Sequence, residues 1–388
     1  MKKLNLVLLL SAAIVAAVLI FNVADARRQV VVMVAGADAV AYQDPRIVVA
    51  LPPGPTQPKV SPDEAGIDMA GIQAAVDYAG ARKTRALVIG EGGHIVFEKY
   101  WDDSTLDTPV DLSGFSPVLT ALTLGVVMND ERSINLDAPL GGYIGAWADD
   151  PRGAISLRQL LTRSSGFARP DGWPWPGTRA ARYALSADLT PLLLDWPVDT
   201  ALRLGESPAA LNADILALAL AGRLGQPYDQ LLAERIWRPI GGGEFSMARG
   251  ARAGCCVRAR IGDWMRIGEM LANDGVFEGS QLTPPRFVNL MLKPTYPNSA
   301  LGYFTHVGAR GMFAAHDVAW LEDKGKQRLW IVPSLRLTIL RLGDEPASAQ
   351  GWDEAMIPDS IIRSTRGWMP GGAAGEGAAV DPNRYAPH

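Results

Sequence analysis

The sequence predicts a mixed α/β fold of the α+β type. One antiparallel sheet, built from both ends of the chain, is flanked by helices and carries an inserted, mostly helical subdomain. Three observations predict this fold: residues 86–101 have the pattern of a β-hairpin, residues from about 139 to 293 have mostly helical periodicity, and strand patterning returns before residue 343. Strands at both chain ends with helices between them are expected to share one sheet, so the helical block is an insertion rather than an independent domain.

Composition narrows the possible functions. The chain has 388 residues, of which 48% are hydrophobic and 20% charged, enough for one large core with an insertion. Its net charge of -4 provides no basic field that would attract a phosphate backbone, and no run of lysines and arginines occurs. We therefore expect no nucleic-acid partner.

The N-terminus has the pattern of an export segment. Two lysines precede residues 4–21, which contain only two polar side chains and would span about 27 Å as a helix, close to the thickness of a bilayer core. A small-x-small cleavage site ends at Ala26, so residues 1–26 are either a signal peptide or a membrane anchor, and the length of the apolar run favours the anchor. We expect the protein at the bacterial inner membrane facing the periplasm, or periplasmic or secreted if it is cleaved after Ala26.

The remaining chain divides into three parts. Residues 27–62 are interpreted as a tether because they become rich in Pro, Ala and Val. Residues 63–365 form the folded domain, with the helical insertion at about 139–293. Residues 366–388 are a Gly/Ala-rich flexible tail that cannot bury enough apolar surface to order itself.

Local patterns predict the individual elements in order. Residues 62–83 are helical, and glycines at the centre of 86–101 mark the hairpin turn. Helices follow at 117–128, 156–163, 211–225, 227–237, 260–274 and 284–293. Strands are predicted at 302–308, 328–335 and 336–343, with a turn at Pro333 and Ser334, and a last helix near 353–364.

Cys255 and Cys256 are the two cysteines of the chain and are adjacent. Neighbouring cysteines can form only a vicinal bridge, so export alone does not predict a disulfide framework. We expect two half-buried thiols.

Four phrases occur in the order found in a known superfamily: INLDAPLGGYIGAW, AISLRQLLTRSSGF, RIGDWMRIGEMLANDGVFEGSQL and LWIVPSLRLTILRLGD. Through them the chain resembles the serine β-lactamase and DD-peptidase superfamily, especially the branch of class C β-lactamases, carboxylesterases and 6-aminohexanoate-dimer hydrolases. The resemblance runs from about residue 86 to 343 and implies a β-lactamase/transpeptidase-like fold. It also implies a serine nucleophile with a lysine three residues later, a Tyr-x-Asn or similar element, and a Lys- or His-x-Gly on the last strands.

The first of these motifs is missing its reactive side chains. The family pattern TPhDLrSvtKsvtALlvG aligns without a gap on residues 108–125, which places Gly114 at the nucleophile and Pro117 at the lysine. Ser116 is the fallback nucleophile, but Leu119 stands three residues after it and supplies no base. We therefore expect Ser116 to be the N-cap of a helix whose first residue is Pro117.

The second and third motifs are also altered. Pro208 falls at the tyrosine, with Ala210 at the following motif residue and Asn212 and Ile215 at framework positions. Lys324 falls where the family has Lys or His. It is followed by Gly325, but Lys326 occupies the position of a second glycine, and the two lysines are also explained as charged residues at a strand start.

Other side chains offer weaker candidates. His306 and His316 lie on neighbouring strand-like segments, but together with His94 and His388 they follow no zinc-ligand spacing, so no metal and no cofactor are expected. Trp173 and Trp175, between prolines, could bind a ligand or a protein, although braced loop tryptophans are the simpler interpretation.

These observations predict an exported, membrane-tethered relative of the β-lactamases that is catalytically inactive. Its function would be to bind a small-molecule ligand in the former cleft or an inner-membrane protein partner. The alternative is an active serine hydrolase, such as an esterase, an amidase or a 6-aminohexanoate-dimer-hydrolase-like enzyme, with a non-standard nucleophile or base.

Overall fold

The computed structural model describes residues 46–130, 134–170, 178–186, 188–199, 207–248, 252–295 and 299–369, with three isolated positions before them. The predicted export segment, apart from those positions, lies outside this part of the chain, as do Trp173, Trp175 and His388 and the predicted tail after residue 369. Across the described residues, no helix has both the length and the apolar character that crossing a bilayer requires. The expectations for the export segment stay predictions.

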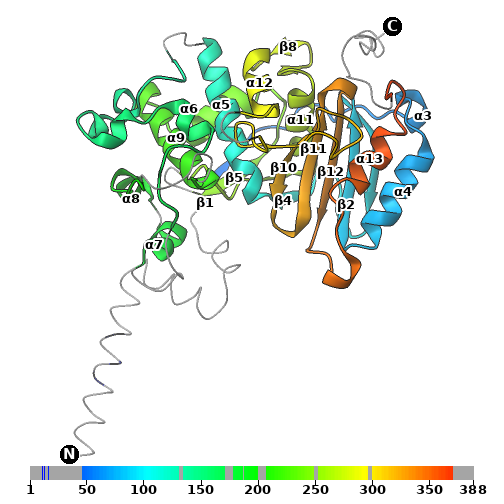
Figure 1. The fold of residues 1–388 in the computed structure, drawn as a ribbon, viewed down its shortest axis with the longest axis horizontal. Coiled ribbons are helices and arrows are strands. Elements are labelled where there is room, and N and C mark those ends of the chain that lie inside the picture. The colour runs from blue at the N-terminus through cyan, green and yellow to red at the C-terminus, as the bar shows by residue number, and fades with distance from the viewer. Residues whose placement is uncertain are drawn as a thin grey trace, which may run out of the picture.

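A six-stranded antiparallel sheet forms the centre of the fold, in the order β3-β2-β12-β11-β10-β9 (Figure 1). Its strands are β2 (Thr84–Glu91), β3 (His94–Tyr100), β9 (His306–Val307), β10 (Ala319–Asp323), β11 (Gln327–Val332) and β12 (Leu337–Gly343). The first and last parts of the chain meet where β2 pairs with β12, with Ile89 opposite Ile339. The prediction of one antiparallel sheet from both chain ends is confirmed.

Helices α3 (Pro62–Ala65), α4 (Met69–Gly80) and α13 (Met356–Ile362) cover one face of this sheet (Figure 1). Ile72 and Ile361 pack there in one apolar cluster with Trp330 of β11. The single helix predicted at 62–83 is divided in two because Gly66 adopts a left-handed conformation, with φ 72°, after α3.

Helix α11 (Ile261–Ala272) covers the other face and contacts β11 and β12. Its Trp264 meets Phe115 edge to face, with ring centroids 5.5 Å apart. Phe115 directly precedes α5 (Ser116–Asp130), a helix buried along most of its length. Helix α5 therefore lies between the sheet side of the molecule and the helical insertion.

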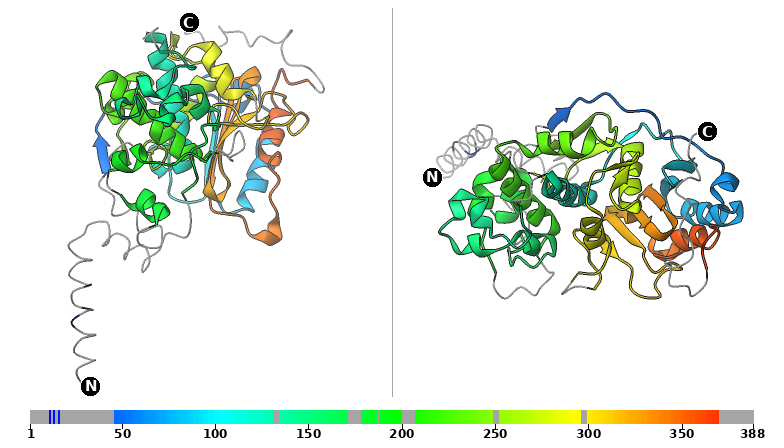
Figure 2. Two further views of the ribbon diagram at one scale, coloured as in Figure 1. Left: turned by 60° about the vertical axis from the view of Figure 1, so that its left-hand side comes forward. Right: turned by 90° about the horizontal axis from the view of Figure 1, so that it is seen from above.

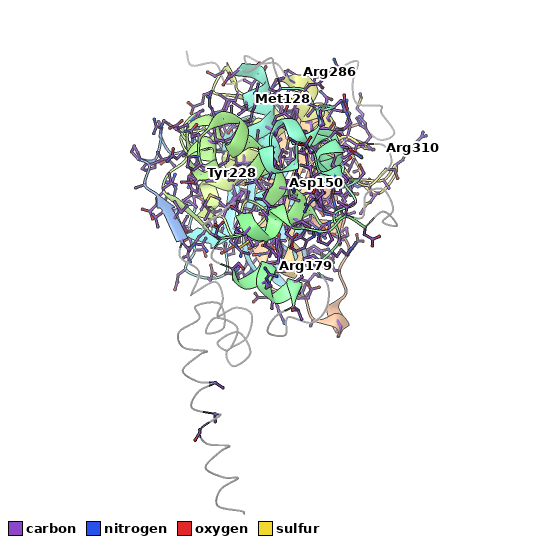
Figure 3. The ribbon with its side chains drawn as sticks, turned by 90° about the vertical axis from the view of Figure 1, so that its left-hand side faces the viewer. Met128, Asp150, Arg179, Tyr228, Arg286 and Arg310 are labelled. Atoms are coloured by element: carbon purple, nitrogen blue, oxygen red, sulfur yellow. A yellow bond between two sulfur atoms is a disulfide. The ribbon has the colours of Figure 1, made fainter. Side chains whose placement is uncertain are left out.

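The insertion forms a helical lobe beside the sheet (Figure 2). Its helices are α6 (Leu157–Leu161), α7 (Arg179–Leu185), α8 (Thr190–Leu194), α9 (Ala209–Leu224) and α10 (Tyr228–Leu232), followed by a π-helical turn (Ala233–Trp237), and three 3₁₀ turns precede α6 (Leu140–Gly142, Gly145–Trp147 and Pro151–Ala154). Figure 3 looks onto this lobe, with Asp150 and Tyr228 near its centre and Arg179 at its lower edge. The hydroxyls of Tyr228 and Thr120 lie 3.1 Å apart, which joins the lobe to α5.

Strands also occur within the insertion, and two of them, β5 and β6, pair with strands from outside it. A four-stranded sheet in the order β1-β5-β6-β4 consists of β1 (Arg46–Val49), β4 (Pro109–Asp111), β5 (Phe245–Ala248) and β6 (Arg258–Arg260). A small hairpin of β7 (Val276–Phe277) and β8 (Ser280–Gln281) precedes α12 (Pro285–Leu292). The predicted tether is therefore not free chain throughout, because β1 pairs with β5 and Gly54 donates a backbone hydrogen bond to Gly241.

Candidate functional site

A cavity of about 250 Å³ lies where the helical lobe meets the β10 edge of the large sheet. Two of its lining residues are Gly114, from the turn before α5, and Pro117, the second residue of α5; two more are Ala209 and Ala210, from the first turn of α9. The remaining walls are formed by Arg163, Gly254, Leu301, Phe304, His306 and Glu322. The structure therefore brings Gly114, Pro117 and Ala210, three positions singled out by the sequence, into one cavity.

Gly114, which the resemblance places at the nucleophile position, has no room for a side chain. Gly114 lies in a 3₁₀ turn (Ser113–Phe115) and faces the end of β10. A Cβ built on Gly114 would stand 2.1 Å from the carbonyl oxygen of Glu322 and 2.9 Å from the Cα of Asp323. Real Cβ atoms do not approach backbone atoms so closely, so a side chain at this position requires a shift of the backbone.

Ser116 does not face the cavity. Its side chain is fully buried, and its Oγ accepts a hydrogen bond from the backbone N–H of Val257 at 3.3 Å. The residue has helical dihedral angles, φ -55° and ψ -41°, and is the first residue of α5, with Pro117 second. The expected N-cap role is therefore wrong: the hydroxyl bonds the residue just before β6, while Pro117 is tolerated because the first helical turn has no intrahelical use for its missing N–H.

Pro208 and Asn212 have structural roles around α9. Pro208 is the N-cap residue of the helix, just before the cavity-lining Ala209. Asn212 is buried. It accepts a hydrogen bond from the hydroxyl of Ser165 at 2.8 Å and donates one to the carbonyl of Leu160 at 3.1 Å. These bonds fix α9 against the end of α6.

Lys324 is not one of the cavity-lining residues. It lies exposed in the turn Lys324–Lys326 between β10 and β11, where its backbone N–H donates to Asp323 Oδ1 at 2.8 Å. Lys326 Nζ lies 3.3 Å from Glu354 Oε1. The charged group that β10 contributes to the cavity is Glu322, which the sequence analysis did not single out.

Glu322 belongs to a charged network behind the cavity wall. Arg328, whose side chain is 2% exposed, pairs with Glu322 Oε1 at 2.8 Å and with Glu354 Oε2 at 2.9 Å. His306 Nε2 lies 3.6 Å from Glu322 Oε2, and the imidazole stacks on the ring of Trp320 with centroids 5.3 Å apart. Burial lowers the pKa of His306, which favours the neutral imidazole.

Arg163 contributes a cationic group to the cavity lining. It adopts a left-handed conformation with φ 57°, which is uncommon for a residue with a side chain. Its Nε donates to the carbonyl of Ser207 at 3.0 Å, and the N–H of Ser207 donates to the carbonyl of Arg163 at 3.0 Å. Burial, followed by the nearby charge of Arg169, lowers the pKa of Arg163. Sequence reasoning did not identify Arg163 as a cavity residue, although it lies within AISLRQLLTRSSGF, one of the four phrases that carry the family resemblance.

Beside the cavity, Cys255 and Cys256 form a vicinal disulfide, so the expectation of two thiols is wrong. Cys256 adopts φ 70°, a local conformation that the sequence pattern does not reveal. The preceding Gly254 lines the cavity and donates its N–H to Asp214 Oδ1 at 2.6 Å. Asp214 also accepts from the hydroxyl of Tyr183 at 2.6 Å, and burial raises its pKa to about 6.

The structure describes two further histidines, His94 and His316. His94 begins β3, and His316 is exposed in the segment before β10. Within the described ranges, no group of three or more His, Cys, Asp or Glu residues could hold a metal ion. The arrangement can therefore offer a ligand one cation, apolar walls and a His–Glu pair.

Comparisons with known proteins give a consistent family. A family model described as Beta-lactamase matches residues 72–254. The D-alanyl-D-alanine-carboxypeptidase/endopeptidase AmpH of Escherichia coli K12 is 28% identical over 209 residues, which cover 48% of this chain and 50% of that protein. The chain thus spans about half the length of the curated relatives it matches.

Two solved structures illustrate the shared fold. A putative 6-aminohexanoate-dimer hydrolase from Bacillus anthracis is similar with a TM-score of 0.63 at 17% identity, covering 80% of this chain and 89% of that one. FmtA from Staphylococcus aureus has a TM-score of 0.59 at 14% identity, covering 84% of this chain and 96% of that one. At these identities the likeness establishes the architecture.

Proposed function

Since the chain is a member of the serine β-lactamase and DD-peptidase superfamily, we propose that it is a non-catalytic member that binds a ligand in the cleft. The observation that carries the proposal is the contact between Gly114 and β10. The position from which the family presents its serine has no side chain, and the carbonyl of Glu322 occupies the space a side chain would need.

The other altered positions support the same proposal. Pro117 has no amine to accept a proton, and Ala210 offers no polar group to the cavity. Catalytic residues that act as a unit are strongly non-additive, so losing one of them leaves at most about 10³- to 10⁴-fold acceleration over water. Binding in the cavity requires none of these groups.

An active hydrolase with a non-standard base is the second candidate. It is favoured by one observation: His306 and Glu322 both line the cavity, and the lowered pKa of His306 favours an imidazole that can accept a proton. Ser116 supports this candidate poorly because its hydroxyl is buried and bonded to the Val257 amide.

Hydrolysis of p-nitrophenyl butyrate and of nitrocefin by the purified chain separates the two candidates. We expect no turnover above buffer. Turnover that disappears in His306→Gln, while a circular dichroism spectrum stays unchanged, would establish the second candidate. Turnover that disappears in Ser116→Ala would identify the fallback serine as the nucleophile.

We also propose that the protein is exported and held at the inner membrane by residues 1–26, where binding an inner-membrane protein partner is the alternative to binding a small molecule in the cleft. The apolar run at 4–21 and the two lysines before it support the proposal. Intact mass of the protein extracted from membranes tests it: a mass that includes residues 1–26 supports the anchor, and loss of those residues indicates cleavage after Ala26.

A further inference from the structure

Arg163 is the cavity's one charged lining residue without an opposite charge beside it, among the residues that the structure describes. Glu322, on the facing wall, is already paired with Arg328 at 2.8 Å. The one side-chain hydrogen bond of Arg163 joins its Nε to the carbonyl of Ser207, and this bond leaves the two terminal nitrogens of the guanidinium without a described partner. Within the described part of the chain, this half-buried charge therefore has no compensating opposite charge.

The position of this guanidinium is fixed before any ligand arrives. The reciprocal bonds between Arg163 and Ser207 hold the arginine at the entrance to α9, where Ala209 and Ala210 line the cavity. Phe304, on another wall, also has a left-handed conformation, with φ 61°. Strained backbone of this kind is retained where the surroundings determine it and is concentrated at binding sites.

An anion would satisfy the charge of Arg163. Arginine stays protonated at neutral pH even where burial and a neighbouring cation oppose its charge. Its planar fork matches the two oxygens of a carboxylate, and such charge-assisted pairs are among the strongest hydrogen bonds in proteins. The cavity thus has an unsatisfied preference for a carboxylate at the Arg163 side.

The remaining walls define the rest of the ligand. Pro117, Ala210, Leu301 and Phe304 are apolar. A cavity of about 250 Å³ matches a small ligand, and a single amino-acid derivative is therefore a suitable probe.

We propose that the cleft binds a small monocarboxylate with a compact apolar group, and that Arg163 holds the carboxylate while Leu301 and Phe304 contact the apolar part. This inference rests on the proposed function as a ligand-binding protein and names the chemistry of its ligand.

The test is isothermal titration of the full-length chain in detergent with N-acetyl-leucine and with its neutral counterpart, N-acetyl-leucinamide. We expect the acid to bind at least ten-fold more tightly than the amide. In Arg163→Gln the acid should lose at least ten-fold in affinity and approach the amide, whereas Arg163→Lys should retain part of the preference because it keeps the charge.

Arg235→Gln is the matched control, because Arg235 is an exposed arginine paired with Asp130 on the helical lobe. It should leave the affinity for the acid unchanged, and circular dichroism should show that each variant is folded. Equal affinity for acid and amide, no saturable binding of either, or full binding of the acid by folded Arg163→Gln would each overturn the inference. A failure of the proposed function would be seen in different measurements. It would appear as hydrolysis of the ester or of nitrocefin, or as a covalent adduct with a serine-directed probe, whether or not the acid binds more tightly than the amide.

Discussion

A Cβ on Gly114 would stand 2.1 Å from the carbonyl oxygen of Glu322, so the turn before α5 and the end of β10 are in contact where a nucleophile would project. A simple substitution of a serine by glycine would leave room for the original side chain. At Gly114 the backbone of the neighbouring strand occupies that room. We therefore expect that restoring a serine at this position does not create an active site.

We predict that Gly114→Ala destabilises the protein by about 2 kcal/mol, the usual cost of forcing extra volume into a packed region. Gly114→Ser should cost at least as much. Even combined with Pro117→Lys, it should not recover ester hydrolysis. Chemical denaturation measures the first effect. Gly145→Ala is the control, because a Cβ at Gly145 meets no atom within 4 Å.

An unchanged unfolding free energy in Gly114→Ala would show that β10 moves away without cost. In that case the nucleophile position would be open, and the steric argument would fail. Recovery of hydrolysis by the double substitution would lead to the same conclusion.

A second prediction concerns the charged network behind the cavity. Replacing Arg328 by Met removes the buried cation that Glu322 and Glu354 share, so Glu354 keeps only Lys326 as a cationic partner and Glu322 loses its arginine. We expect a loss of about 3 kcal/mol in stability, near the lower end for a broken buried pair because both glutamates keep some exposure. Arg235→Gln, which breaks an exposed pair with Asp130, should cost no more than about 1 kcal/mol. Similar losses in the two variants would contradict the burial argument.

A third prediction is a pH dependence of stability. Burial raises the pKa of Glu269 to about 7, although Gln57 donates to its Oε2 at 3.0 Å. Between about pH 4.5 and 7 the folded protein therefore keeps a proton that the unfolded chain has released, so this group lowers stability as the pH rises through that window. Above it the penalty is constant.

Glu269→Gln should remove that penalty. We expect the variant to be more stable than the parent by about 3 kcal/mol at pH 8 and nearly equal to it at pH 4.5, measured by thermal unfolding. A variant less stable at pH 8, or equally stabilised at both pH values, would show that the carboxyl titrates normally.

Local pattern was sufficient for much of the fold. The periodicity at 117–128 predicted α5, and the glycines at the centre of 86–101 predicted the turn between β2 and β3, because both signals depend on neighbouring residues. The alignment of the family pattern on residues 108–125 identified Gly114 and Pro117 as the positions that correspond to the nucleophile and the base.

Other features depend on distant parts of the chain and had no local signal. Strand β1 was assigned to a tether because its pairing with β5 joins residues about 200 positions apart. Strand β10 was not predicted because its five residues, which end in Glu322 and Asp323, show little periodicity. The contact between this strand and Gly114 could therefore not be predicted either. The ion pairs of Glu322 and the bond that orients Arg163 are likewise properties of the assembled cavity.

We propose that no hydroxyl of this chain is activated for acyl transfer. Incubation of the folded full-length protein with a fluorophosphonate and with a fluorescent penicillin, followed by intact-mass measurement, tests it most directly, with an active serine hydrolase treated in parallel to verify each probe. We predict an unchanged mass with both probes. One adduct per chain, mapped to Ser116 or to any other serine, would contradict the account.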